Sequence, residues 1–289
     1  MLAAAVLVAA GAAPAGATEA LPEDAMECLE CHEDDSLEKE LANGEILSLN
    51  VTEKGFLRSV HADMGCDGCH PDINLDDHPG EREIASREEY RDRLSAACAD
   101  CHEDPGEKSQ PHRYLISQAG APACASCHVA HSITDIAGWK ASVDDRTYCL
   151  TCHSQKIGLT FGNGRLHSLS MKNNMLKDSV HLDHECSDCH GDFTRKSHSV
   201  RVFESDREHT VALSRVCREC HDEMFELYEG SIHSSLIEKG NLAAPICVDC
   251  HGFHSVGPAA TLATIAGEPC RRCHDEVFGE IGRASCRER

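Results

Sequence analysis

The chain has 289 residues, a formal net charge of −22 and only 12 aromatic residues. The acidic excess argues against nucleic acid as a partner, because phosphate binding needs a basic face, and it favours a basic or cation-bridged partner. So few large side chains cannot fill an ordinary core in a chain of this length.

Residues 1–17 form an apolar segment that ends in Ala15-Gly16-Ala17, the small-residue pattern of a signal-peptidase site. The usual basic region is missing, so the true start of the protein stays open, and a buried N-terminal helix is the alternative. We expect a signal peptide at 1–17 and export to the periplasm, the outer surface or the exterior. No later run reaches the 18 apolar residues of a membrane helix, so we expect no membrane span in the printed sequence.

The pattern Cys-x-x-Cys-His then occurs nine times and uses 18 of the 19 cysteines. Two thiols three residues apart can bond the two vinyl groups of one porphyrin, and the adjacent imidazole can bind its iron. The motif cysteines are Cys28, Cys31, Cys66, Cys69, Cys98, Cys101, Cys124, Cys127, Cys149, Cys152, Cys186, Cys189, Cys217, Cys220, Cys247, Cys250, Cys270 and Cys273. The motif histidines are His32, His70, His102, His128, His153, His190, His221, His251 and His274.

Structural zinc, disulfides and thiol redox chemistry are the alternative interpretations of these cysteine pairs. Zinc sites built from such pairs use two pairs per metal and need no histidine after the second cysteine. Nine pairs is an odd number, and every pair is followed by histidine. A thiol oxidoreductase uses one or two such motifs. The sequence therefore predicts nine covalently attached haem c groups.

Flat porphyrins can supply the core that the side chains lack. We expect a mainly α fold with extensive loops, a haem-packed core, little or no β-sheet and poor folding without haem. Ser86-x-x-Glu89 and Ser205-x-x-Glu208 are capping boxes, each 12 residues before a motif cysteine. They predict helices that run into the motifs at Cys98 and Cys217.

The motifs repeat with a period of about 121 residues, the spacing that separates Cys28 from Cys149 and Cys149 from Cys270. We therefore expect two tandem tetrahaem modules, at 18–140 and 141–262. Residues 263–280 would begin a truncated third module that carries the ninth haem.

Eight histidines outside the motifs keep the same register, so each module holds four haems and four matched histidines. This equality predicts that the four irons of each module are bound by two histidines each. The predicted distal ligands are His61, His78, His112, His131, His181, His198, His233 and His254. Which of them serves which haem stays open.

Three further histidines have no repeat partner, namely His167, His184 and His209. We expect them at the surface or beside other ligands. One of them could instead complete the ninth haem, whose matched ligand would lie in the absent part of a third module.

The chain resembles periplasmic multihaem cytochromes c of the tetrahaem and doubled-CxxCH group, through stretches such as SVHADMGCDGCHPDI and APICVDCHGFHSV. The resemblance covers roughly residues 25–278. It implies distal roles for the histidine of Ser-Val-His and for the one three residues after the motif histidine, which are His61, His181, His131 and His254. Some relatives continue into a membrane domain that exchanges electrons with quinone.

The last residues, 281–289, resemble the translation of a sequencing adapter and include Cys286, the one cysteine outside a motif. We expect them to be non-native, in which case the gene continues; a genuine free thiol on a flexible end is the alternative.

Six-coordinate iron has no position free for substrate, and the sequence offers no catalytic constellation. We expect a non-catalytic electron carrier, or the cytochrome part of a larger oxidoreductase, with redox proteins or a quinone-linked membrane complex as partners. It would pass electrons between that complex and periplasmic or extracellular acceptors. Two alternatives stay open. One is a reductase of nitrite, hydroxylamine or a sulfur oxyanion, for which the ninth haem is the candidate open site, and the other is a subunit of a cytochrome filament.

Overall fold

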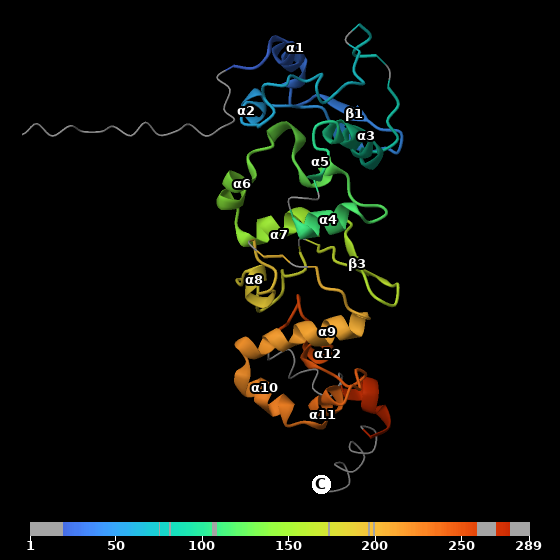
Figure 1. Ribbon diagram of the computed structural model, residues 1–289, viewed down its shortest axis with the longest axis vertical. Helices are drawn as coiled ribbons and strands as arrows, with labels where there is room; N and C mark the ends of the chain where they lie inside the picture. The colour runs from blue at the N-terminus through green and yellow to red at the C-terminus, as the bar shows by residue number, and fades with distance from the viewer. Residues whose placement is uncertain are drawn as a thin grey trace, which may run out of the picture. The chain divides into compact units, whose positions relative to one another are not determined.

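The computed structural model describes residues 20–74, 76–80, 82–105, 109–172, 174–195, 197–198, 200–258 and 270–277 (Figure 1). The chain forms two compact units that meet in sequence between Val143 and Asp144. The predicted signal peptide and C-terminal tail lie outside the described residues, and the predicted module boundaries stay predictions. In the part of the chain that is described, no helix is both long and apolar enough to cross a bilayer.

Short helices and loops make up the first unit. Its elements are α1 (Glu23–His32), β1 (Glu38–Glu40), β2 (Ile46–Ser48), α2 (Glu53–Phe56), α3 (Arg87–Ala99), α4 (Gln110–Ile116), α5 (Cys124–Cys127), the 3-10 helix η2 (Ala130–Ser132) and α6 (Ile136–Ser142).

The second unit repeats this order with some changes. It contains α7 (Asp145–His153), β3 (Gly158–Thr160), β4 (Leu166–Ser168), α8 (Cys186–Cys189), α9 (Asp206–Ser214), the 3-10 helix η3 (Arg215–Glu219), α10 (Asp222–Glu229), α11 (Ile232–Glu238) and α12 (Cys247–His251). Residues 270–277 are also helical. The expectation of a mainly helical, loop-rich fold with little β-sheet is confirmed.

Polar side chains begin the two helices that the sequence predicted. Ser86 Oγ accepts a hydrogen bond from Glu89 N at 3.1 Å, and Ser205 Oγ accepts one from Glu208 N at 3.2 Å. The first helix, α3, runs through Cys98 as expected. The second changes at Ser214 into the tighter η3, which carries Cys217. Ser214 Oγ donates to the Val211 carbonyl, a local bond of the kind that bends helices.

Each unit contains one two-stranded antiparallel hairpin, β1–β2 in the first and β3–β4 in the second. Both turns contain Asn-Gly, and the two glycines, Gly44 and Gly164, have φ values of 83° and 79°. Side chains disfavour this left-handed region, whereas glycine adopts it without strain. The repeat is therefore kept in the turn chemistry as well as in the cysteine spacing.

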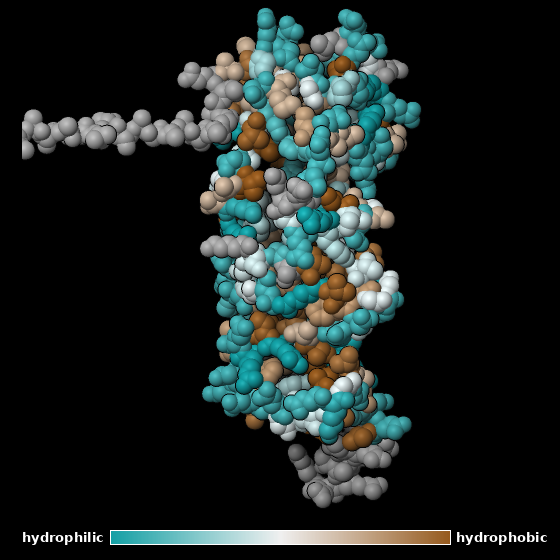
Figure 2. Space-filling view, in the orientation of Figure 1, coloured by the Kyte–Doolittle hydropathy of each residue, from teal (hydrophilic) through white to brown (hydrophobic). Residues whose placement is uncertain are grey.

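The apolar core is sparse for two units of this size. Only 12 apolar residues are buried in the described part of the chain, and the main cluster is Leu21, Ala25, Leu29, Phe56 and Ala62. Apolar side chains lie among hydrophilic ones on the surface (Figure 2); Val129, Leu166, Val202 and Leu227 are each at least 68% exposed. Polypeptide alone leaves much apolar surface for a large apolar cofactor to cover.

Candidate haem sites

Short helical turns place the two thiols of a motif on one side. α5, α8 and α12 begin at the first motif cysteine, whereas α1 and α7 end at the motif histidine. The backbone N–H of the motif histidine donates to the carbonyl of the first cysteine, as in His70 to Cys66 at 3.0 Å. Residues three apart on such a turn share one face. Both sulfurs can therefore reach the same porphyrin.

Eight pairs of histidine rings face each other with their centroids 6.0–6.4 Å apart. Two imidazoles that each bind one metal atom at about 2 Å, as histidine ligands do, have their centroids roughly 6 Å apart. The rings are too far apart for direct contact, and their spacing matches one iron between them. The arrangement fits haem bound from both sides.

Each pair joins one motif histidine to one of the eight histidines matched by the repeat. In the first unit the pairs are His32–His78, His70–His131, His102–His61 and His128–His112. In the second unit they are His153–His198, His190–His254, His221–His181 and His274–His233. The structure thus brings every predicted distal ligand opposite a motif histidine.

Backbone carbonyls orient several of these rings. Nδ1 of His32 lies 2.8 Å from the Leu49 carbonyl, and Nδ1 of His153 lies 3.0 Å from the matched Leu169 carbonyl. Only a protonated Nδ1 satisfies such a carbonyl, so Nε2 is left with its lone pair free for iron.

The Ser-Val-His stretches are held by their backbones. Ser59 is fully buried and its Oγ accepts from His61 N at 3.2 Å, while Val60 N donates to the Ile133 carbonyl at 2.7 Å. In the second unit Val180 N donates to the Val256 carbonyl at 2.9 Å. These bonds tie a distal histidine to the segment that follows a later motif.

Burial keeps many of these imidazoles neutral. Burial lowers the pKa of His190 to about 4, with smaller contributions from nearby histidines such as His254. Burial also lowers the pKa of His70 and of His131, which face each other. Neutral imidazole is the form that binds metal. These three imidazoles are therefore in the form that binds iron at neutral pH.

Consecutive motifs lie beside each other within each unit. Burial and the adjacent Cys28 thiol raise the pKa of Cys66 to about 12. The same proximity joins Cys98 to Cys124, Cys149 to Cys186, Cys217 to Cys247, Cys69 to Cys101, Cys189 to Cys220 and Cys250 to Cys270. Haems attached to these thiols would form a continuous series in each unit.

One of these contacts could be mistaken for a different metal site. In the described residues, the ligand atoms of Asp145, Cys149 and Cys186 lie within 4.8 Å of one another. The carboxylate already accepts from Ser187 N at 3.2 Å, and in the first unit Asp24 accepts from Cys66 N at 3.3 Å. The repeated aspartate thus holds the backbone of the next motif, and its two sulfur neighbours belong to two separate haem motifs.

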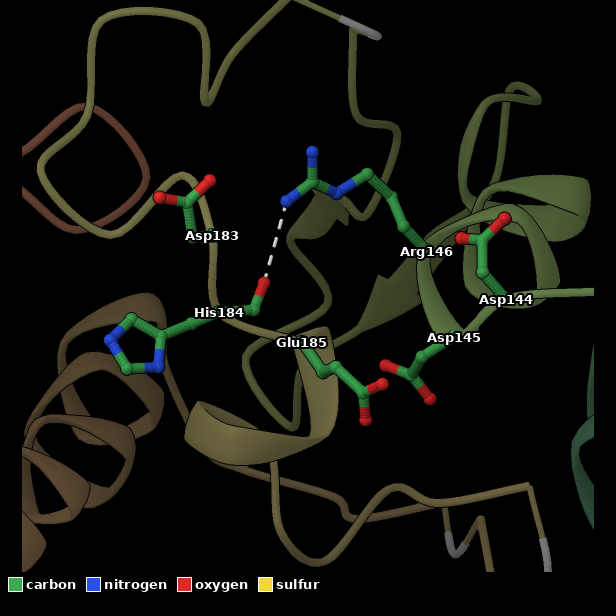
Figure 3. Close-up of a pocket in the computed structure, with 6 residues that line it drawn as sticks. All are labelled: Asp144, Asp145, Arg146, Asp183, His184 and Glu185. Carbon is green, nitrogen blue, oxygen red and sulfur yellow. Dashed lines mark hydrogen bonds between the residues drawn. The ribbon is translucent and has the colours of Figure 1, made fainter.

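None of the three histidines without repeat partners forms a ring pair with a motif histidine, although the ring of His184 lies 5.9 Å from that of His181. His167 Nδ1 is 2.5 Å from Asp206 Oδ1, and its ring is 5.2 Å from that of His209. His184 is exposed, with Nδ1 3.3 Å from Asp188 Oδ2. It borders a small polar pocket lined by Asp144, Asp145, Arg146, Asp183, His184 and Glu185 (Figure 3), where Arg146 donates to its carbonyl.

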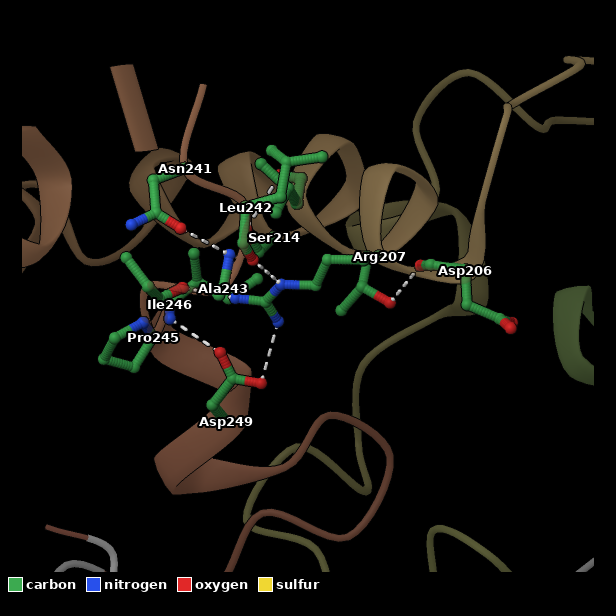
Figure 4. Close-up of polar contacts among 12 residues, drawn as sticks. Asp206, Arg207, Ser214, Asn241, Leu242, Ala243, Pro245, Ile246 and Asp249 are labelled. Atoms are coloured by element: carbon green, nitrogen blue, oxygen red, sulfur yellow. Dashed lines mark hydrogen bonds and ion pairs between the residues drawn. The ribbon is translucent and has the colours of Figure 1, made fainter. Parts of the chain in front are cut away.

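An arginine fixes the motif in α12, a contact that the sequence did not suggest (Figure 4). Arg207 donates through Nε to the Leu242 carbonyl at 2.5 Å and through a terminal nitrogen to Asp249 Oδ1 at 2.9 Å. Asp249 Oδ2 in turn accepts from Ile246 N at 2.7 Å. These bonds connect α9 to the start of α12, whose motif runs from Cys247 to His251.

Comparison with family models matches residues 54–129 to the family of cytochrome c7 and related cytochrome c. The matched segment contains the second, third and fourth motifs. Comparison with curated proteins and with solved structures gave no match. Together with the ring pairs, the family match supports a multihaem c-type cytochrome that holds haem c covalently and transfers electrons.

Proposed function

We propose that the chain is an exported electron relay that holds nine haems through its nine motifs, eight of them between two histidines. The observation that carries this proposal is the set of eight ring pairs at 6.0–6.4 Å. Thiols can be paired for many reasons, whereas a second imidazole opposite a motif histidine has a clear use only when an iron lies between them.

The side chains divide the work of holding the cofactor. The motif cysteines form thioethers to the vinyl groups, the motif histidines bind one face of the iron, and their facing partners bind the other. Bound haem supplies one-electron iron chemistry. Two imidazoles fill both axial positions and keep substrates away from the iron, so a paired site acts as a carrier.

The order of the motifs gives the relay its path. The adjacent thiols connect motifs one to four in the first unit and motifs five to nine in the second. Short distances between successive sites favour electron hopping along each unit. A net charge of −22 favours a basic or cation-bridged redox partner. We infer that the relay connects a quinone-linked membrane complex to periplasmic or extracellular acceptors.

Mass spectrometry of the exported product tests this function. We expect nine covalent haem additions per chain, removal of residues 1–17, and a reduced absorption spectrum dominated by low-spin c-type haem. Bare polypeptide, or a protein that contains zinc in place of haem, would contradict the proposal.

A further inference from the structure

The second unit has one more motif histidine than it has matched partners. It contains five motifs and four matched histidines, whereas the first unit contains four of each. The matched histidines can therefore serve only four of its five irons. Because His112 faces His128 in the first unit, the repeat register would assign His233 to His251 of the eighth motif and leave the ninth incomplete.

The ring geometry gives the opposite assignment. His233 faces His274 of the ninth motif, with ring centroids 6.2 Å apart and ring planes 26° apart. His251 of the eighth motif is exposed, and no histidine ring faces it, although all twenty histidines lie in described residues. In the first unit the equivalent of His233 is His112, which faces His128 of the fourth motif at 6.4 Å.

A local difference accompanies the different pairing of His112 and His233. Nδ1 of His112 lies 2.9 Å from the Pro105 carbonyl, which orients its ring. The repeat places Glu226 at the equivalent position, and its carbonyl accepts from Gly230 N at 3.1 Å at the end of α10. The Glu226 carbonyl therefore already accepts a hydrogen bond within α10, unlike the Pro105 carbonyl, which lies beside the His112 ring. The eighth and ninth motifs are also adjacent, through Cys250 and Cys270, so His233 can reach the ninth.

The three histidines without repeat partners do not face His251 either. His167 and His209 lie with Asp206, and His184 lies with Asp188 and beside the ring of His181. Arg207 and Asp249 meanwhile hold the start of α12, where the eighth motif begins.

We propose that the eighth haem, attached through Cys247, Cys250 and His251, has an open axial position that accepts a small uncharged π-acceptor ligand such as carbon monoxide. A five-coordinate iron offers such a ligand a direct bond, which the eight paired sites do not. The strongly acidic chain disfavours anions at the same position. The inference depends on the proposed haem attachment and adds one ligand-binding site to the relay.

Titration of the reduced holoprotein with carbon monoxide counts the open irons. We expect one carbon monoxide per nine haems. A protein that binds none, or more than one, overturns the proposal. Covalent haem content is measured by mass on the same sample, so a failure of haem attachment is distinguished from a failure of the open site.

The double substitution Cys247→Ala/Cys250→Ala locates the site. It should give a chain with eight haems that binds no carbon monoxide, whereas binding at one per chain would place the open iron elsewhere and overturn the assignment. His167→Ala is the control, because this ring contacts Asp206, Phe161 and His209 and forms no pair with a motif or matched histidine, and it should still bind one. If the double variant does not mature, a structure of the wild-type holoprotein decides. Coordination of the ninth iron by Nε2 of His233 supports the proposal. Coordination of the eighth iron by the same atom overturns it.

Discussion

The fourth motif of the first unit and the eighth motif of the second have nearly the same sequence context but different surroundings. Each follows Ala-Pro and lies after a serine-capped helix that carries a matched histidine. His112 in α4 faces the fourth motif, whereas His233 in α11 faces the ninth.

Both the helix that carries the histidine and the groups around it differ between the two units. The helix starts differ by one residue: His112 is the third residue of α4 and its N–H donates to Ser109 Oγ, whereas His233 is the second residue of α11, where Ser234 N donates to Ser231 Oγ. The surroundings differ as well, through the Pro105 carbonyl in one unit and the adjacent ninth motif in the other. On the proposed assignment, two nearly equal repeats would give a closed relay site and an open ligand site.

The largest effect on carbon monoxide binding is expected when either of the two facing histidines is removed. His112→Ala frees one face of the fourth haem and His233→Ala frees one face of the ninth. Each variant should therefore bind two carbon monoxide molecules per chain, twice the number expected for the wild type. Titration of the reduced proteins measures this number. A count that stays at one in either variant contradicts the pairing of that histidine.

Electron paramagnetic resonance should distinguish the two histidine pairs by the angle between their rings. The rings of His112 and His128 are 85° apart, whereas those of His233 and His274 are 26° apart. Nearly parallel imidazoles donate π density along one direction and split the iron d orbitals, whereas perpendicular imidazoles leave them nearly degenerate. His112→Ala should therefore remove an axial low-spin signal and His233→Ala a rhombic one. Loss of the same type of signal from both variants would contradict these geometries.

The two motifs are also held by different contacts, which predicts unequal losses of stability. Arg207→Ala removes three hydrogen bonds that tie α9 to the start of α12. We expect the holoprotein to lose about 1–3 kcal/mol of unfolding free energy, because a charged donor is lost from partly buried acceptors. Denaturant unfolding followed by circular dichroism measures it. Arg207→Lys should recover only part of the loss, because an ammonium cannot reproduce the forked contacts.

In the first unit, Ser95 makes the contacts that correspond to those of Arg207. Ser95 Oγ accepts from Cys124 N at 2.9 Å and donates to the Arg91 carbonyl, which ties α3 to the fourth motif. Ser95→Ala should cost about 1 kcal/mol, as expected for one neutral hydrogen-bonding group. A loss of unfolding free energy larger than that of Arg207→Ala would contradict the expected order of the two effects.

The smallest effect is expected at a cluster that the first unit lacks. Asp206 contacts His167 and Arg165, and the Arg165 side chain is 72% exposed. Asp206→Asn should therefore change the unfolding free energy by only about 0.5 kcal/mol, as for exposed ion pairs, and leave all nine haems attached. Loss of a haem from this variant would show that the cluster supports a ligand.

Much of the architecture is readable from the sequence because it depends on short-range chemistry. The Cys-x-x-Cys-His spacing, the serine caps at Ser86 and Ser205 and the Asn-Gly turns each act within a few residues. The low aromatic content likewise predicts the sparse core. The tightening of α9 into η3 at Ser214 was not predicted, because no short-range pattern in the sequence marks it.

The sequence by itself determined which histidines could serve as ligands, since the repeat register separates the eight matched residues from the three unmatched ones. The tertiary structure decided which motif histidine each of them faces. His131 lies three residues after His128 yet faces His70, and His61 faces His102 rather than the nearer His70. The two ligands of one haem approach from opposite faces of the porphyrin, so a close neighbour in sequence lies on the wrong side. Only packing between distant segments, such as Val60 against Ile133, brings the second imidazole into place.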